Sequence, residues 1–170
     1  DSESPSIFFE VLIESGAYQK LFPMLEMPQS SNLKLLDQKN LTIEVRFALW
    51  LYLQSPGKIG LLCDHLKCPK DMQHIAELVS IWHSFADNFL SHEPEEILNF
   101  YLKTDGLRRQ KRFEIILNAF ESLNIDASLI VELKTQLNSI RISDLKNLNI
   151  AQELAEERLS IIHRFIDSAK

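Results

Sequence analysis

The sequence predicts an all-α fold, and three observations lead to that prediction. Only 4 glycines and 6 prolines occur among 170 residues, which is few for a turn-rich β protein. Apolar side chains recur at helical spacing in several segments, and no segment alternates apolar and polar residues between turn signals. No repeat of fixed period and no low-complexity stretch interrupts this pattern. A chain of this length can bury a substantial core, so we expect a compact multi-helix domain.

Capping and turn residues set the expected helix boundaries. Ser4-Pro5 opens the first helix and Gly16 ends it, while Pro23 prevents any continuation. Residues 28–40 read as a polar connection with one short apolar turn, and Ser55-Pro56-Gly57 is expected to stop the second helix. The expected helices are 5–15, 41–54, 58–66, a long one from Pro69 to about Phe85, one from Pro94 to Leu102, 105–123, 126–141 and 150–167. Ile150, Leu154, Ile161, Ile162 and Phe165 are expected to line the apolar side of the last helix.

Charge and cysteine content narrow the class of function. The net charge is −6, so any polyanionic partner must be met by a local basic patch. Cys63 and Cys68 lack a second cysteine pair, and the five histidines are scattered, so two reduced thiols of a cytoplasmic protein are expected rather than a metal site. The apolar residues 7–13 form a stretch that is too short to span a bilayer.

Motifs of small-molecule catalysis are absent from the sequence. It contains no glycine-rich loop that could hold a phosphate group and no nucleophile motif. The start at Asp1 suggests a piece of a longer protein.

One segment, "LKTDGLRRQKRFEIIL", concentrates positive charge. Residues 103–112 contain five cations and one anion, a local charge of +4, so the other 160 residues carry −10. Helical spacing predicts that Arg108, Lys111 and Arg112 are solvated and that Arg109 leans toward the core as an ion-paired residue. Cations in a first helical turn oppose the helix dipole, whereas phosphate favours that position. Two interpretations stay open, contact with RNA or phosphate and a solvated face paired with Glu114 and Glu121.

Several segments, in order, resemble bacterial tRNA nucleotidyltransferases, the CCA-adding enzymes and their poly(A) polymerase relatives. "SPSIFFEVLIESGAYQKLFPML" resembles the stretch after the catalytic head, where a helix ends in glycine before Leu-Phe-Pro, although Met24 replaces the usual acidic residue. "VRFALWLYL" is similar to the helix that carries the His-Asp pair of an HD phosphohydrolase domain, and that pair falls on Tyr52 and Leu53. "LCDHLKCPKDMQHIAELVSIWH", "KTDGLRRQKRFEIIL" and "RISDLKNLNIAQELAEERLSIIHRFI" resemble later segments.

The resemblance implies an HD-like helical bundle over residues 1–95, a C-terminal helical tail over 96–170, and a catalytic head outside this chain. The helix of "VRFALWLYL" would have become core, because Tyr52 and Leu53 cannot hold a divalent ion as His and Asp do. Phosphatase and cyclic phosphodiesterase activities are therefore not expected, and no catalytic residue is assigned. Mg²⁺, CTP and ATP would bind in the head, and no cofactor is expected in this chain.

The resemblance also implies partners and a binding site. The partners would be tRNA, held by shape and phosphate contacts, and the protein's own N-terminal head, whereas a second copy in a homodimer would be the partner of a dimerisation module. The expected RNA-binding residues are Arg108, Arg109, Lys111 and Arg112. Three alternatives stay open, namely a helical protein-interaction or dimerisation module without RNA contact, a residual HD hydrolase, and a poly(A) polymerase tail. The net charge of −6 disfavours the last, because such tails tend to be strongly basic.

Overall fold

Helices form every regular element in the described part of the chain, residues 4–140 and 149–169 of a computed structural model. The all-α prediction is confirmed. The chain divides into two compact units, Asp1–His83 with Glu114–Ile125 and Ser84–Phe113 with Asp126–Lys170. Residues 84–95 group with the second unit and residues 114–125 with the first, and the HD-like subdomain over residues 1–95 and the tail over 96–170 stay predictions. Within the described ranges, no helix is long and apolar enough to cross a membrane.

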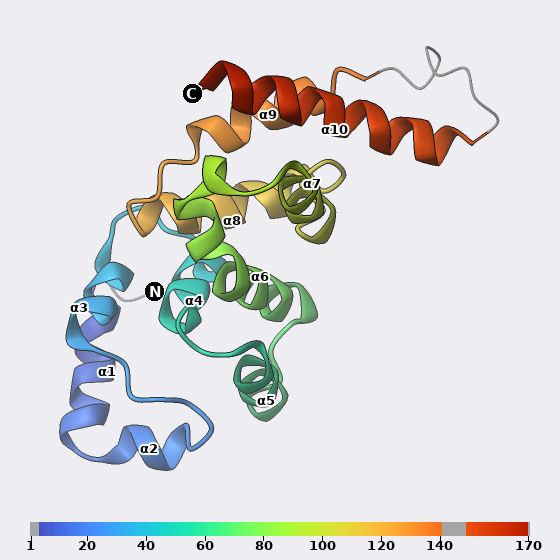
Figure 1. The fold of residues 1–170 in the computed structure, drawn as a ribbon. Coiled ribbons are helices and arrows are strands. Elements are labelled where there is room, and N and C mark those ends of the chain that lie inside the picture. The colour runs from blue at the N-terminus through green and yellow to red at the C-terminus, as the bar shows by residue number, and fades with distance from the viewer. Residues whose placement is uncertain (1–3, 141–148, 170) are drawn as a thin grey trace. The chain divides into compact units, whose positions relative to one another are not determined.

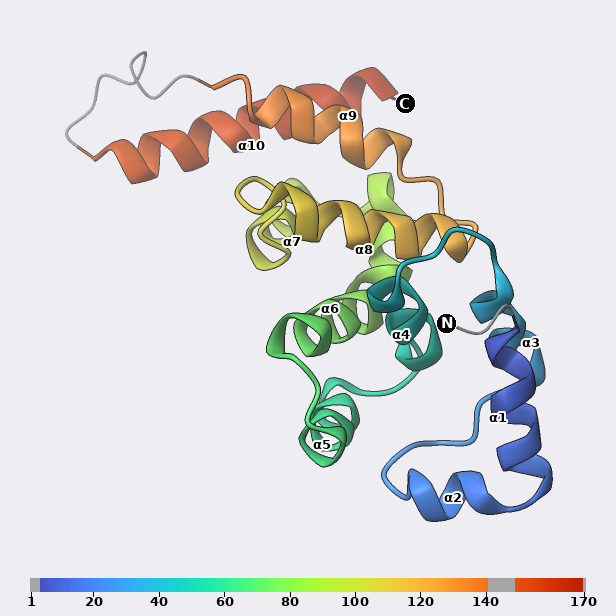
Figure 2. The same ribbon diagram turned by 180° about the vertical axis from the view of Figure 1, so that it is seen from behind.

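The first unit contains most of the N-terminal helices. They are α1 (Pro5–Glu14), α2 (Ala17–Leu21), α3 (Ser30–Leu33), the 3-10 helix η1 (Lys34–Asp37), α4 (Ile43–Leu51) and α5 (Pro56–Leu66), with parts of α6 (Lys70–Asp87) and α8 (Gln110–Ser122). Helix α1 contacts α2, α3 and η1, and these elements are neighbours in both ribbon views (Figures 1 and 2). The hydroxyl of Ser6 donates a hydrogen bond to Asp37 Oδ2 at 2.5 Å, which fastens α1 to η1.

An aromatic cluster joins α1, α2 and α4. The ring of Trp50 lies 4.8 Å from Phe9 and 5.1 Å from Phe22, and its Nε1 donates a hydrogen bond to the Tyr18 hydroxyl at 3.2 Å. Gly16 has a φ of 70°, a left-handed conformation that glycine adopts without steric cost, and it makes the turn between α1 and α2. The segment from Gly16 through Phe22 therefore packs its aromatic residues against α4.

Several helix boundaries differ from the sequence expectations. Helix α4 ends at Leu51, and Pro56 begins α5 rather than stopping α4, because proline is well suited to the first position of a helix. Residues 28–40 form α3 and η1 instead of one short turn in a polar connection. Helix α8 begins at Gln110, not at residue 105, which changes the placement of the basic residues before it.

Aromatic residues pack together in the second unit. It contains η2 (Phe89–Ser91), α7 (Pro94–Lys103), α9 (Ser128–Leu137) and α10 (Ile150–Ala169), with the end of α6 and the start of α8. Phe100 lies 6.0 Å from both Phe89 and Phe113 between ring centroids. The buried Tyr101 hydroxyl donates a hydrogen bond to the carbonyl of Ile130 at 2.6 Å, which ties α7 to α9.

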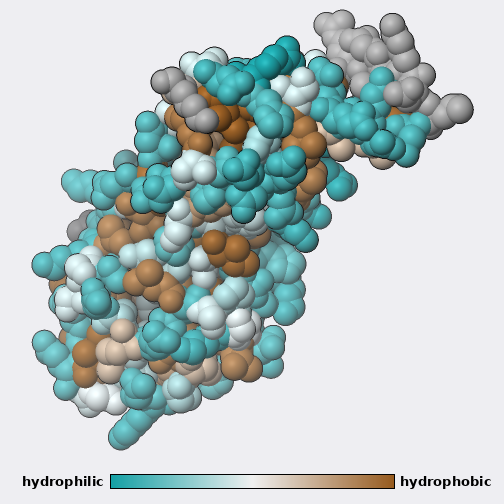
Figure 3. Space-filling model, in the orientation of Figure 1, coloured by the Kyte–Doolittle hydropathy of each residue, from teal (hydrophilic) through white to brown (hydrophobic). Residues whose placement is uncertain are grey.

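Helix α10 packs on α7 and α9 through its C-terminal half, and it runs beside α9 in both ribbon views (Figures 1 and 2). Its buried residues are Ile161, Ile162, Phe165 and Ile166. Three of the five expected apolar positions are therefore confirmed, whereas Leu154 is half-buried and Ile150 is 47% exposed. Many hydrophilic residues cover the visible side of this helix (Figure 3). Residues 141–148, the "RISDLKNL" with which the last quoted segment begins, lie outside the described residues.

Candidate nucleic-acid interface

The basic residues follow a tightly capped helix end. Asp105 has a φ of 54°, and the backbone N–H of Gly106 donates to the carbonyl of Tyr101 at 2.9 Å. This six-residue hydrogen bond around a left-handed residue is the Schellman form of helix termination. The Thr104 hydroxyl also donates to the carbonyl of Phe100 at 2.7 Å. The end of α7 is therefore fixed, and the chain leaves it in a defined direction toward α8.

Asp105 holds the loop between α7 and α8 with both its backbone and its side chain. Its carbonyl accepts hydrogen bonds from the N–H groups of Arg108 and Arg109 at 2.9 and 2.8 Å. Its carboxylate accepts a hydrogen bond from the guanidinium of Arg112, and Arg109 Nε lies 3.7 Å from the same carboxylate. One aspartate therefore organises the start of the basic segment.

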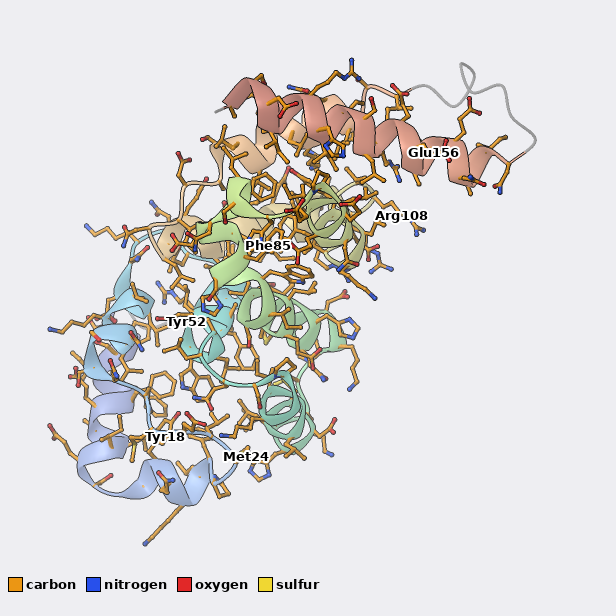
Figure 4. All side chains as sticks on the ribbon, viewed as in Figure 1. Tyr18, Met24, Tyr52, Phe85, Arg108 and Glu156 are labelled. Atoms are coloured by element: carbon orange, nitrogen blue, oxygen red, sulfur yellow. The ribbon has the colours of Figure 1, made fainter. Side chains whose placement is uncertain are left out.

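The cations separate into structural and exposed residues. The side chain of Arg112 is only 13% exposed, whereas that of Arg109 is 62% exposed. The expected exposure of these two residues was wrong, because Arg109 lies at the boundary of α8 and the left-handed turn brings Asp105 back to Arg112. The expected ion pair of Arg109 is confirmed by its contact with Asp105. Arg108 and Lys111 are exposed, as expected. Figure 4 shows Arg108 on the outside of the ribbon.

Four exposed cations therefore surround the start of α8: Lys103, Arg108, Arg109 and Lys111, which we call the basic loop. The first turn of α8 contains no acidic residue. The unsatisfied N–H groups and positive end of a helix dipole add to the positive field at such a position. This arrangement can contact phosphate groups of a polyanion, whereas none of its members is a nucleophile or a general base at neutral pH.

The positions expected to replace an HD pair lie just beyond α4. Val45, Ala48, Leu49 and Leu51 are buried, which agrees with the expectation that this helix has become core. Tyr52 is half-buried, donates a hydrogen bond to Asn32 Oδ1 at 3.3 Å, and lies edge-on to His83 with ring centroids 5.2 Å apart. Burial raises the pKa of Tyr52. Leu53 is 55% exposed, so at this position the expectation of a core residue was wrong.

The C-x4-C segment lies at the end of α5. Cys63 is buried, Cys68 is half-buried, and both are free thiols. Asp64 and His65 between them are exposed. Across residues 4–140 and 149–169, no three or more His, Cys, Asp or Glu side chains converge as a group that could hold a metal ion.

Sequence comparison relates the chain to characterised proteins. It is 29% identical over 154 residues to the CCA-adding enzyme of Coxiella burnetii (strain RSA 331 / Henzerling II), a match that covers 89% of this chain and 41% of that enzyme. It is 31% identical over 114 residues to the CCA-adding enzyme of Pseudomonas putida (strain W619), covering 66% of this chain and 31% of the enzyme. It is 27% identical over 156 residues to the multifunctional CCA protein of Thioalkalivibrio sulfidiphilus, covering 70% and 38%.

Other comparisons add no relative. No protein-family profile matches the chain, and no solved structure does. The chain spans about two fifths or less of the length of the relatives named above. It is thus a homologue of the CCA-adding enzymes, matched to them along most of its own helical sequence.

Proposed function

We propose that this chain is the helical, tRNA-binding part of a CCA-adding tRNA nucleotidyltransferase. The similarity to the Coxiella burnetii CCA-adding enzyme over 89% of the chain carries the proposal. The chain would follow the catalytic head of a cytoplasmic enzyme that adds C, C and A to the tRNA 3′ end. Mg²⁺, CTP and ATP would bind in that head, and the helices described here would hold the tRNA without taking part in nucleotide transfer.

The basic loop is the proposed contact with tRNA. Its four exposed cations lie on a segment of local charge +4 in a chain of net charge −6, so they form a defined site for a polyanion. Lysine and arginine contacts to phosphate give affinity without base recognition, which suits an enzyme that accepts many tRNAs. Arg112 is not included, because its side chain is only 13% exposed and its guanidinium donates to Asp105, whereas Arg109, which lies 3.7 Å from the same carboxylate, is 62% exposed. Four phosphate contacts give modest affinity, so the head would supply further binding energy.

The outer face of α1 is the proposed contact with the head. Ile7, Phe8 and Val11 are 57%, 57% and 55% exposed, and they recur at the spacing of one helix face. An apolar face of this kind is costly in water and is typical of a surface that another domain covers. Its occupant in the full-length enzyme would be the head, since the relatives contain more than twice the aligned length.

Binding of this chain to tRNA over a series of salt concentrations tests the proposal. The logarithm of the binding constant should fall linearly with the logarithm of salt concentration. The double variant Arg108→Ala/Lys111→Ala should reduce that slope by about one unit for each cation removed. The matched control is Lys20→Ala/Lys39→Ala, which removes two exposed cations of the first unit and should leave the slope unchanged. Absence of binding at low salt, or equal effects of the two double variants, would contradict the proposal.

Two alternative functions predict other experimental results. A protein-interaction or dimerisation module would show concentration-dependent association in sedimentation equilibrium without tRNA binding. The apolar side of α10 gives this dimerisation alternative limited support. Ile161, Ile162 and Phe165 are buried inside the second unit, whereas Ile150 in the N-terminal part of the helix is exposed. A residual hydrolase would release product from a 2′,3′-cyclic nucleotide with added Ni²⁺, Mn²⁺ or Mg²⁺.

A further inference from the structure

The end of α5 brings two cysteines together through its backbone. Lys67 has a φ of 57°, and the N–H of Cys68 donates to the carbonyl of Cys63 at 2.9 Å. This is a Schellman termination, in which the residues at the two ends of the six-residue hydrogen bond commonly contact each other through their side chains. Here those residues are Cys63 and Cys68.

The two thiols contact each other but differ in accessibility. Cys63 is 2% exposed, whereas Cys68 is half-buried and can be reached from solvent. Burial, together with the charge and hydrogen bond of Cys68, raises the pKa of Cys63 to about 12. An accessible thiol beside a buried one is an arrangement in which the first can react with an external disulfide and the second can resolve the product.

We propose that Cys63 and Cys68 form a redox-active dithiol, which a low-molecular-weight disulfide such as oxidised glutathione converts to an intramolecular disulfide. The left-handed turn at Lys67 and the hydrogen bond from Cys68 N–H to the Cys63 carbonyl hold the two residues beside each other, and a disulfide bond needs such proximity. The site belongs to α5 and the residue before Pro69, outside the basic loop. The inference is therefore independent of the proposed tRNA binding.

The exchange has two balanced steps. The Cys68 thiolate, having lost its proton to solvent, attacks one sulfur of oxidised glutathione, so that a mixed disulfide forms and one glutathione thiolate leaves. Cys63 then loses its proton to solvent and attacks Cys68 Sγ, which releases the second glutathione thiolate. Two protein thiols are oxidised and one glutathione disulfide is reduced to two thiols.

Mass spectrometry of the folded chain after incubation with oxidised glutathione tests the proposal. After an acid quench, the mass of the wild-type chain should be lower by two hydrogens. When the quenched chain is denatured and treated with an alkylating reagent, no free thiol should react. Cys63→Ser should instead stop as a stable glutathione adduct on Cys68, and Cys68→Ser should stay largely unmodified because Cys63 is buried. A wild-type chain that keeps both thiols, or that stops at the glutathione adduct, would overturn the proposal.

A matched pair of substitutions at Lys67 tests whether the turn builds the site. Lys67→Gly keeps the left-handed conformation without strain and should form the disulfide as readily as the wild-type chain. Lys67→Val should lower the equilibrium constant for oxidation about tenfold, because a β-branched residue disfavours that conformation. Circular dichroism would verify that both variants are folded. The inference would be overturned if both folded variants were oxidised with the same equilibrium constant, and if that constant were no higher than for the chain unfolded in guanidinium chloride. Such a result would show that the short distance along the sequence, and not the turn, brings the two thiols together.

Discussion

The guanidinium of Arg112 donates a hydrogen bond to the carboxylate of Asp105 and closes the loop between α7 and α8. The side chains of Arg112 and Asp105 are 13% and 28% exposed, so this pair is partly shielded from water. Arg108 and Lys111 are exposed residues of the same segment. Neighbouring cations of one basic sequence therefore have different roles, one in holding the loop and the others in facing solvent.

Removal of the shielded arginine should destabilise the fold, and removal of an exposed one should not. Arg112→Ala leaves the Asp105 carboxylate without its hydrogen-bonded partner, and we expect a loss of about 1–3 kcal/mol in the free energy of unfolding. Arg108→Ala removes the same charge from the exposed surface and should change that energy by no more than about 0.5 kcal/mol. Urea denaturation of the two variants provides the comparison. Equal losses would contradict a structural role for Arg112.

Gly106 should tolerate no larger residue. A Cβ atom at this position would lie 2.8 Å from Cε2 of Phe113, a ring that is fully buried. Gly106→Ala should therefore cost about 1–3 kcal/mol by overpacking. The control is Gly57→Ala in α5, where a Cβ meets nothing within 4 Å and alanine favours the helix by up to about 1 kcal/mol. Thermal unfolding should thus give shifts of opposite sign, and a neutral Gly106→Ala would show that the ring of Phe113 can move aside.

Elements with strong apolar periodicity could be predicted from the sequence. The last helix was expected at 150–167 and occupies Ile150–Ala169, and prolines correctly marked the starts of α1 and α7. The missed elements α3 and η1 are each only four residues long, too short for a helical period to be visible. Their apolar residues Leu33 and Leu36 become buried through packing with α1 and α4, which local sequence does not reveal.

The candidate site could be predicted only in part, because its details depend on one backbone conformation. The charge of the segment and the exposure of Arg108 and Lys111 follow from composition and spacing. The exposure of Arg109 and the burial of Arg112 could not be predicted, because a non-glycine residue in the left-handed region at Asp105 has no clear sequence signal. Residues 114–125 belong to the first unit although residues 84–113 before them do not. Such packing between segments far apart in the sequence cannot be predicted from local sequence patterns.

Buried tyrosines should make the protein less stable in alkali. Burial raises the pKa of Tyr101 well above its usual value of 10.0, and it also raises those of Tyr18 and Tyr52. Above about pH 10 the unfolded chain loses phenolic protons that the folded chain retains, so stability is full below that pH and falls as pH rises. Tyr101→Phe should make this decline less steep, by up to about 1.4 kcal/mol per pH unit at the alkaline end of the range. The slope is measured by urea denaturation at several pH values between about 9 and 11, on both sides of the ordinary tyrosine pKa. An unchanged slope would mean that Tyr101 ionises equally well in both states.

The two thiols should react with iodoacetamide at different rates. Burial, followed by the effects of Cys68 and Glu77, raises the pKa of Cys63 to about 12. Since the thiolate is the reactive form, Cys68 should be alkylated first near neutral pH. In the variant Cys68→Ser, the rate at Cys63 should continue to rise with pH well beyond 9.0, the ordinary value for a cysteine. Peptide mapping by mass spectrometry locates the label. Preferential labelling of Cys63 near neutral pH would contradict its burial.

Tyr52 and Leu53 should differ in their tolerance of substitution, although both stand where the resemblance places a metal-binding pair. Leu53→Asp puts a carboxylate at a position that is 55% exposed, so we expect a change in the free energy of unfolding of about 0.5 kcal/mol or less. Tyr52→Phe removes the hydroxyl that donates to Asn32 and should cost about 0.5–1.5 kcal/mol. Urea denaturation distinguishes the two. A larger loss for Leu53→Asp than for Tyr52→Phe would mean that the position of Leu53 is core after all, as the resemblance implied.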